Sequence, residues 1–257
     1  MKFAVAPDKY ALKKRVDRFF YGSTLCRQEV YNFVDLLTQK RELNTYAFGG
    51  LVRDIGLFSI RDFYSDIDLV VDASACELEE ALMFLPASCS IQKNKFGGYR
   101  VLKQNWEFDI WCAEDTWAIK NNFVPYKGIE SLLDTTFLSW DSALFDLKRR
   151  KLICHEDYLT SLVTGKIDVV LRNTPNELGS FVRLARAIYS KGAHNIGPKA
   201  VETLQSGLET YCFKSIMDHE RESYRMNYLN VYNLTALQHA IELHWCSSSH
   251  VQINSYY

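Results

Sequence analysis

Gly49-Gly50-Leu51-Val52-Arg53-Asp54, followed by Ser65-Asp66-Ile67-Asp68-Leu69-Val70-Val71, is the stretch of this 257-residue sequence that decides its fold. Residues 45–48 before the glycine pair are typical of a short buried strand, and the glycines leave the backbone open where that strand turns into a helix. N–H groups at a helix N-terminus favour anions such as a triphosphate. A glycine pair alone is also typical of a tight turn that binds no ligand. The acidic segment that follows is needed to distinguish a phosphate-binding turn from such a structural turn.

The acidic segment predicts a strand with two carboxylates on one face. Residues 67–71 are apolar and rich in β-branched side chains, and alternation along a strand puts Asp66 and Asp68 on the same side. Two carboxylates so close repel each other unless a cation lies between them, and Mg²⁺ prefers such oxygen ligands. The alternative is a solvated strand end with two acidic residues.

A third carboxylate is available in residues 106–111. Phe108 and Ile110 share one face of this predicted strand, which leaves Glu107 and Asp109 on the other, as in a sheet with one wet face. If this strand lies beside the first, Asp109 completes a site for two metal ions. Glu107 is the competing candidate and ranks second.

On these motifs the chain resembles the head domain of poly(A) polymerases and class II CCA-adding tRNA nucleotidyltransferases, in the polymerase-β nucleotidyltransferase superfamily. Phe96-Gly97 is similar to the family's Phe-Gly turn, Asp134-Thr135-Thr136-Phe137 stands where the family has Arg-Asp-Phe-Thr, and residues 181–188 resemble its arginine-bearing neck helix. The matching positions of the glycine and acidic segments are Gly49, Gly50, Val52, Arg53, Asp54, Asp66, Ile67, Asp68, Leu69 and Val70.

The chain also departs from the family pattern. Leu133 and Leu138 stand where the family has an arginine and an asparagine, which removes expected sugar contacts. Gly179-Ser180 replaces the Glu-Asp pair with which CCA-adding enzymes choose the incoming base, which argues against templated addition of C and then A. The loop before the acidic strand is longer than usual, with Arg61 and Asp62 in the extra length.

The resemblance implies an α+β fold: a nucleotidyltransferase head with a small mixed sheet flanked by helices, followed by an all-helical, neck-like C-terminal region. Helical patterns at residues 8–40, with a break near Gly22-Ser23, and again after Tyr158 agree with this order. We therefore expect an N-terminal helical segment at residues 1–43, the head at 44–156 and the neck-like region at 157–257.

The resemblance also implies an activity. It predicts a magnesium-dependent enzyme that transfers an NMP from an NTP to a hydroxyl, most plausibly the 3′ end of an RNA such as tRNA. Two Mg²⁺ ions are expected at the catalytic residues, which are Asp66, Asp68 and Asp109. The residues expected to bind the nucleotide are Gly49, Gly50, Arg53, Asp54, Asp134, Arg183 and Arg186.

Two alternatives stay open at this point. The acceptor could be a protein side chain or a small molecule, as for a toxin or a defence effector, or the chain could be a catalytically silent nucleotide-binding subunit. The sequence left after the neck is too short for the family's tRNA clamp, so we expect either a protein partner that supplies acceptor binding or a smaller acceptor.

Composition and charge limit the classes of protein to which the chain can belong. The apolar content of 47% and charged content of 24% are ordinary for a globular protein, and no apolar run reaches membrane-spanning length, so we expect a cytoplasmic protein without membrane contact. A net charge of -1 argues against coating nucleic acid by bulk electrostatics. The basic run 148–151 fits a solvated hairpin flank better than an RNA contact. The seven cysteines contain no C-x-x-C pair and predict neither a disulfide framework nor a zinc site.

Overall fold

The computed structural model describes residues 4–22, 27–58, 60, 66–244 and 251–253. By its internal contacts the chain divides into two units, with residues 1–136 and 140–159 in unit 1 and residues 137–139 and 160–257 in unit 2. The loop positions Arg61 and Asp62, Ser65 of the opening motif, and Cys26 and Cys246 lie outside the described residues. The described cysteines are free thiols.

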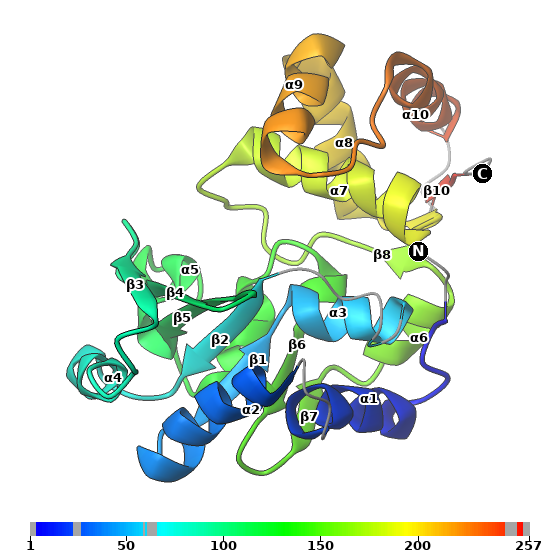
Figure 1. Cartoon of the computed structure of the whole chain (residues 1–257). Coiled ribbons are helices and arrows are strands. Elements are labelled where there is room, and N and C mark those ends of the chain that lie inside the picture. The colour runs from blue at the N-terminus through cyan, green and yellow to red at the C-terminus, as the bar shows by residue number, and fades with distance from the viewer. Residues whose placement is uncertain (1–3, 23–26, 59, 61–65, 245–250, 254–257) are drawn as a thin grey trace. The chain divides into compact units, whose positions relative to one another are not determined.

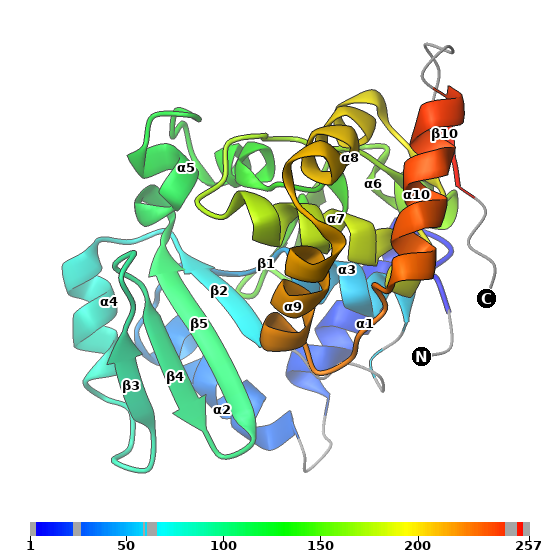
Figure 2. The same ribbon diagram turned by 90° about the horizontal axis from the view of Figure 1, so that it is seen from above.

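Unit 1 is built on a seven-stranded mixed sheet with the strand order β3-β4-β5-β2-β1-β6-β7 (Figure 1). β2 and β5 run parallel, whereas the other neighbouring strands are antiparallel. Figure 2 shows β3, β4, β5 and β2 side by side at one end of this sheet. The strands are β1 (Thr45–Phe48), β2 (Ile67–Val71), β3 (Ser90–Lys93), β4 (Tyr99–Lys103), β5 (Trp106–Cys112), β6 (Ala143–Asp146) and β7 (Lys151–Cys154).

Two helices of unit 1 begin at a residue whose side chain caps the helix N-terminus. The Asp8 side chain accepts from the N–H of Ala11 at the start of the first helix, and Ser74 forms a reciprocal capping box with Glu77 at the start of α4. α6 starts in unit 1 and continues into unit 2. The helices are α1 (Lys9–Tyr21), α2 (Gln28–Asp35), which continues as a π-helical turn at Leu36–Lys40, α3 (Gly50–Leu57), α4 (Ala75–Leu82), α5 (Trp117–Lys120) and α6 (Tyr158–Val163).

Buried apolar residues lie on both faces of the sheet, and one of these faces also carries the acidic residues. Ile67 of β2 and Phe108 of β5 are fully buried, and the Phe33 ring of α2 lies 4.2 Å from the Phe108 ring, centroid to centroid. On the opposite face, Val70 packs in a buried cluster with Leu132 of the 3₁₀ segment Ile129–Thr135. The strand period of two therefore puts the acidic residues on the face opposite Ile67 and Phe108.

Unit 2 is mainly helical, as expected. The helices are α7 (Glu177–Lys191), α8 (Pro198–Thr210), α9 (Phe213–Ser223) and α10 (Val231–His244). α7 and α8 pack closely because Gly207 has no side chain: a Cβ there would lie 2.0 Å from Cδ2 of Phe181. The unit is not purely helical, since β8 (Lys166–Ile167), β9 (Asn195–Ile196) and β10 (Val251–Gln252) form a small sheet with the order β10-β9-β8.

The predicted α+β class, with a mixed sheet and a helical C-terminal region, is confirmed. The strands expected at residues 45–48 and 67–71 have these same bounds in the structure. The N-terminal helices pack in the same unit as the sheet. No helix among the described residues has the length and apolar character that a membrane crossing requires.

Phe108→Ala should lower the free energy of unfolding of the protein by about 3–5 kcal/mol, because it removes a fully buried ring that packs on Phe33. Urea unfolding followed by circular dichroism measures this change. Phe96→Ala is the matched control, since Phe96 is 43% exposed and its loss should change stability by no more than about 0.5 kcal/mol. Equal effects of both substitutions would contradict the assignment of the core face.

Candidate active site

The parallel pairing of β2 and β5 brings the predicted carboxylates together. Asp68 lies opposite Asp109 in the register, and the period of two puts Asp66 beside Glu107 on the same face. One carboxylate oxygen from each of Asp66, Glu107 and Asp109 lies within 4.8 Å of the other two. These three residues are called the acidic triad below, and Asp68 borders the triad through its pairing with Asp109.

Glu107 belongs to the triad, although the sequence ranks it below Asp109. Both residues come from the polar face of β5, where alternation with the buried Phe108 turns them the same way. Asp109 and Glu107, which the sequence offers as alternatives for the third carboxylate, therefore both belong to the site. Three clustered carboxylates offer the hard oxygen ligands that suit Mg²⁺, so the residues present fit a divalent cation.

Arg100 of β4 balances part of this negative charge. Its Nε lies 2.8 Å from Oδ1 of Asp109, its Nη2 lies 2.6 Å from Oδ2 of the same residue, and its Nη1 lies 2.7 Å from Oε1 of Glu107. The hydrogen bonds to Asp109, together with the negative charges of Asp109, Glu107 and Asp66, raise the pKa of the guanidinium against the opposing effect of burial. Arg100 was not among the residues predicted from the sequence.

The glycine turn lies at the same end of the sheet as Asp68. β1 is antiparallel to β2 with Ala47 opposite Leu69, so the chain leaves β1 where β2 begins. Gly49 has φ 64° and ψ -122°, a conformation that glycine adopts at no steric cost, and α3 starts at the next residue. The helix N-terminus therefore stands next to the start of β2, where an anion held by its N–H groups would meet the acidic strand.

Arg53 is held in a buried ion cluster beside this turn. Its Nε lies 2.7 Å from Oδ1 of Asp54, and its Nη1 is ion-paired with Asp141. Burial lowers the pKa of Arg53, but the charges of Asp141 and Asp54 outweigh burial and raise it. A Cβ on Gly50 would lie 3.2 Å from Nη2 of Arg53, so the glycine also makes room for the guanidinium.

This ion cluster fixes the turn, which is a structural task for Arg53 and Asp54. Their predicted contact with a nucleotide stays a prediction. Asp141 was missed because it comes from the distant segment Ser139–Asp141, and only its place among buried neighbours marks it. Asp134 lies in the 3₁₀ segment Ile129–Thr135, with its side chain 63% exposed and Oδ1 4.0 Å from Nε2 of His155, and its nucleotide contact likewise stays a prediction.

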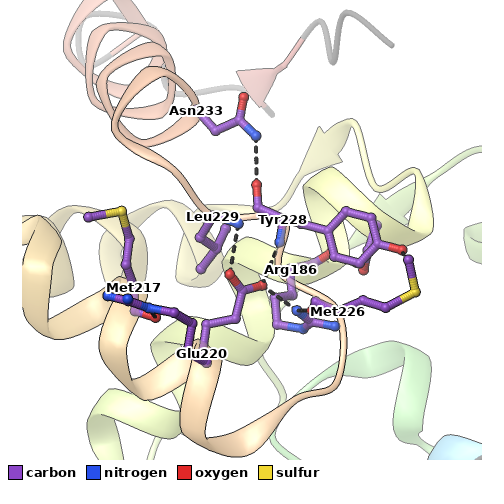
Figure 3. Close-up of polar contacts among 9 residues, drawn as sticks. Arg186, Met217, Glu220, Met226, Tyr228, Leu229 and Asn233 are labelled. Carbon is purple, nitrogen blue, oxygen red and sulfur yellow. Dashed lines mark hydrogen bonds and ion pairs between the residues drawn. The ribbon is translucent and has the colours of Figure 1, made fainter.

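The two predicted arginines of unit 2 have different surroundings. Arg183 is exposed on α7, and its side chain makes no ion pair or hydrogen bond with the residues that the structure describes. Arg186 is ion-paired with Glu220 of α9 and donates to the carbonyl of Met226 at 2.7 Å (Figure 3). Its guanidinium also lies over the ring of Tyr224. Their role in nucleotide binding stays a prediction, but Arg183 has the freer side chain.

Glu220 is the residue around which this part of unit 2 is organised. It is fully buried, and besides Arg186 it accepts from the N–H groups of Tyr228 and Leu229 at 3.0 and 2.8 Å (Figure 3). The carboxylate thereby ties α7, α9 and the segment after α9 together. No motif in the sequence marks it.

Glu220→Ala should lower the free energy of unfolding by about 3–5 kcal/mol, because it leaves the Arg186 charge and two backbone N–H groups without their acceptor. Thermal and urea unfolding of the whole chain measure the change. Glu222→Ala is the control, since Glu222 is exposed on the same helix. A Glu220→Ala protein as stable as the control would contradict a structural role for this carboxylate.

Comparison with known proteins places this geometry in a known fold. No protein-family model matches the chain. Protein CgeD of Bacillus subtilis (strain 168) is 33% identical over 88 residues, which are 32% of this chain and 19% of that protein.

Solved structures match over most of the chain. A CCA-adding enzyme in complex with CTP superposes with a TM-score of 0.58 at 20% identity, covering 95% of this chain and 56% of that one. A tRNA nucleotidyltransferase with a primer tRNA and an incoming ATP analogue gives 0.55 at 15% identity, with 82% and 61% covered. The Thermotoga maritima CCA-adding enzyme bound to tRNA gives 0.52 at 22% identity, with 85% and 48% covered. The chain spans about half the length of these enzymes, and its predicted resemblance to them is confirmed at the level of the fold.

Proposed function

We propose that this protein is a magnesium-dependent nucleotidyltransferase that transfers an NMP from an NTP to the 3′ hydroxyl of an RNA such as tRNA. The observation that carries the proposal is the placement of Asp66, Asp68, Glu107 and Asp109 on one sheet face, next to the glycine turn that begins α3. The fold shared with enzymes whose structures contain CTP, an ATP analogue or tRNA supports the same assignment.

The roles of the residues follow from their positions. Asp66, Asp68 and Asp109 would hold Mg²⁺, with Glu107 as a further oxygen ligand, and Asp109 would help to orient the acceptor hydroxyl. The bound metal would stabilise the triphosphate charge and lower the pKa of the attacking hydroxyl. The Gly49 turn, kept in shape by the buried Arg53, would present backbone N–H groups to the triphosphate.

Base selection by a Glu-Asp pair is not part of this proposal. At the corresponding positions the N–H of Gly179 donates to Oδ1 of Asn176, which caps α7, and Ser180 is buried with its hydroxyl 2.8 Å from that of Thr174. A Cβ at residue 179 would lie 2.4 Å from Nδ2 of Asn176. The two positions serve the helix cap, so we infer that the nucleotide preference differs from ordered C and A addition.

Asp68→Asn should reduce NMP transfer at least about 100-fold, because it removes a negative charge beside Asp109 that we assign as a metal ligand. The assay combines purified protein, Mg²⁺, each labelled NTP in turn and total tRNA, with the products separated on a denaturing gel. Asp157→Asn is the matched control, since this aspartate is exposed in the same unit, and it should leave transfer unchanged.

The pattern of label decides between acceptors. Label on tRNA with the native protein and the control variant, but not with Asp68→Asn, would support the proposal and identify the nucleotide. Label only on protein or on small molecules would show that the acceptor is one of these and not RNA. Magnesium-dependent NTP binding without pyrophosphate release would instead indicate a nucleotide-binding subunit without catalysis.

A further inference from the structure

We propose that Arg100 is an internal counter-ion of the acidic triad, which competes with the divalent metal and couples metal binding to the presence of the triphosphate. The inference rests on the proposed function, because it concerns the same site. Its starting observation is that the guanidinium is already ion-paired with two of the three carboxylates that a metal would neutralise.

The contact between Arg100 and the triad is made by strand register. β4 is antiparallel to β5 with Arg100 opposite Asp109, so both side chains point to the acidic face. The fork of the guanidinium takes both oxygens of Asp109 and reaches one oxygen of Glu107. Such bidentate, charge-assisted pairs are among the stronger hydrogen-bonded contacts in proteins.

A metal and the guanidinium need the same oxygens. Mg²⁺ requires its ligand oxygens at about 2.0–2.1 Å in a near-octahedral arrangement, with their lone pairs directed at the ion. In the structure each oxygen of Asp109 already accepts a hydrogen bond from Arg100, one from Nε and one from Nη2. The positive charges of the two cations also repel each other at this short range. Metal coordination through the lone pairs that Arg100 engages therefore requires Arg100 to withdraw.

Arg100 is free to withdraw, unlike the enclosed Arg53 and Arg186. Its side chain is 46% exposed, whereas those of Arg53 and Arg186 are each 12% exposed and bound to buried carboxylates. An exposed guanidinium that leaves its partner returns to water, so no buried charge is left unpaired. Arg100 can thus change partners without disturbing the packing around it.

The triphosphate supplies the second partner. When metal binds alone, the displaced guanidinium loses its carboxylates and gains only water. When an NTP is present, the same guanidinium can bind the phosphate oxygens, for which its planar fork is well suited. Metal and NTP should therefore bind cooperatively in the native protein, with Arg100 carrying the coupling.

The test measures Mn²⁺ binding by calorimetry and by electron paramagnetic resonance, with and without a non-hydrolysable NTP. In the native protein the NTP should tighten Mn²⁺ binding about tenfold. Arg100→Met should bind Mn²⁺ alone about tenfold more tightly than the native protein, and the NTP should then have little further effect. Arg100→Lys, which keeps the charge but lacks the fork, should fall between the two.

Lys93→Met is the matched control for the loss of one positive charge. Lys93 lies on the neighbouring strand β3, is 57% exposed, and pairs with Glu79 rather than with the triad. It should leave both Mn²⁺ affinity and coupling at native values. A similar gain of affinity in this variant would overturn the specific role of Arg100 in favour of a general charge effect.

Two further outcomes separate this inference from the proposed function. If the native protein binds Mn²⁺ but Arg100→Met binds it equally or more weakly, Arg100 merely orients the carboxylates and the inference fails, while the proposed function stands. If neither the native protein nor Arg100→Met binds Mn²⁺, with or without NTP, the proposed function fails and the inference with it.

Discussion

The parallel pairing of β2 with β5 is the contact on which the arrangement of the site depends. At the start of β2 and along β5, carboxylates alternate with buried apolar residues, and the pairing of Asp68 with Asp109 puts the carboxylates of both strands on the same face. A shift of the register by one residue would turn one acidic row toward the core, next to Phe33. Burial of Ile67 and Phe108 therefore fixes the acidic face as firmly as it fixes the core.

Much of this arrangement could be predicted from the sequence because it depends on local patterns. The strand at residues 67–71 is apolar and β-branched, the glycine pair marks the strand-to-helix turn, and alternation along each strand gives the face of Asp66 and Glu107. The resemblance to a known family supplied the step that local patterns lack, namely that the two acidic strands are neighbours.

Contacts between distant segments could not be predicted in this way. Asp141 reaches Arg53 across 88 residues and Glu220 reaches Arg186 across 34, and neither acidic residue stands in a motif. Arg100 is different, because Lys103 pairs with Trp106 across a two-residue turn, and counting outward along both strands places Arg100 opposite Asp109. The register of this hairpin therefore predicts the contact, although a pattern of carboxylates alone does not mark it.

The exposure of an arginine in an ion pair indicates whether the pair holds segments of the fold in place or can exchange its partners. Arg53 and Arg186 are enclosed, so the loss of either partner would leave a buried charge, and such pairs hold segments in one position. Arg100 also forms a bidentate pair, but its own side chain is 46% exposed, so the guanidinium returns to water when the pair breaks. Its position in the acidic triad is therefore better explained by the charge balance of the site than by the packing of the sheet.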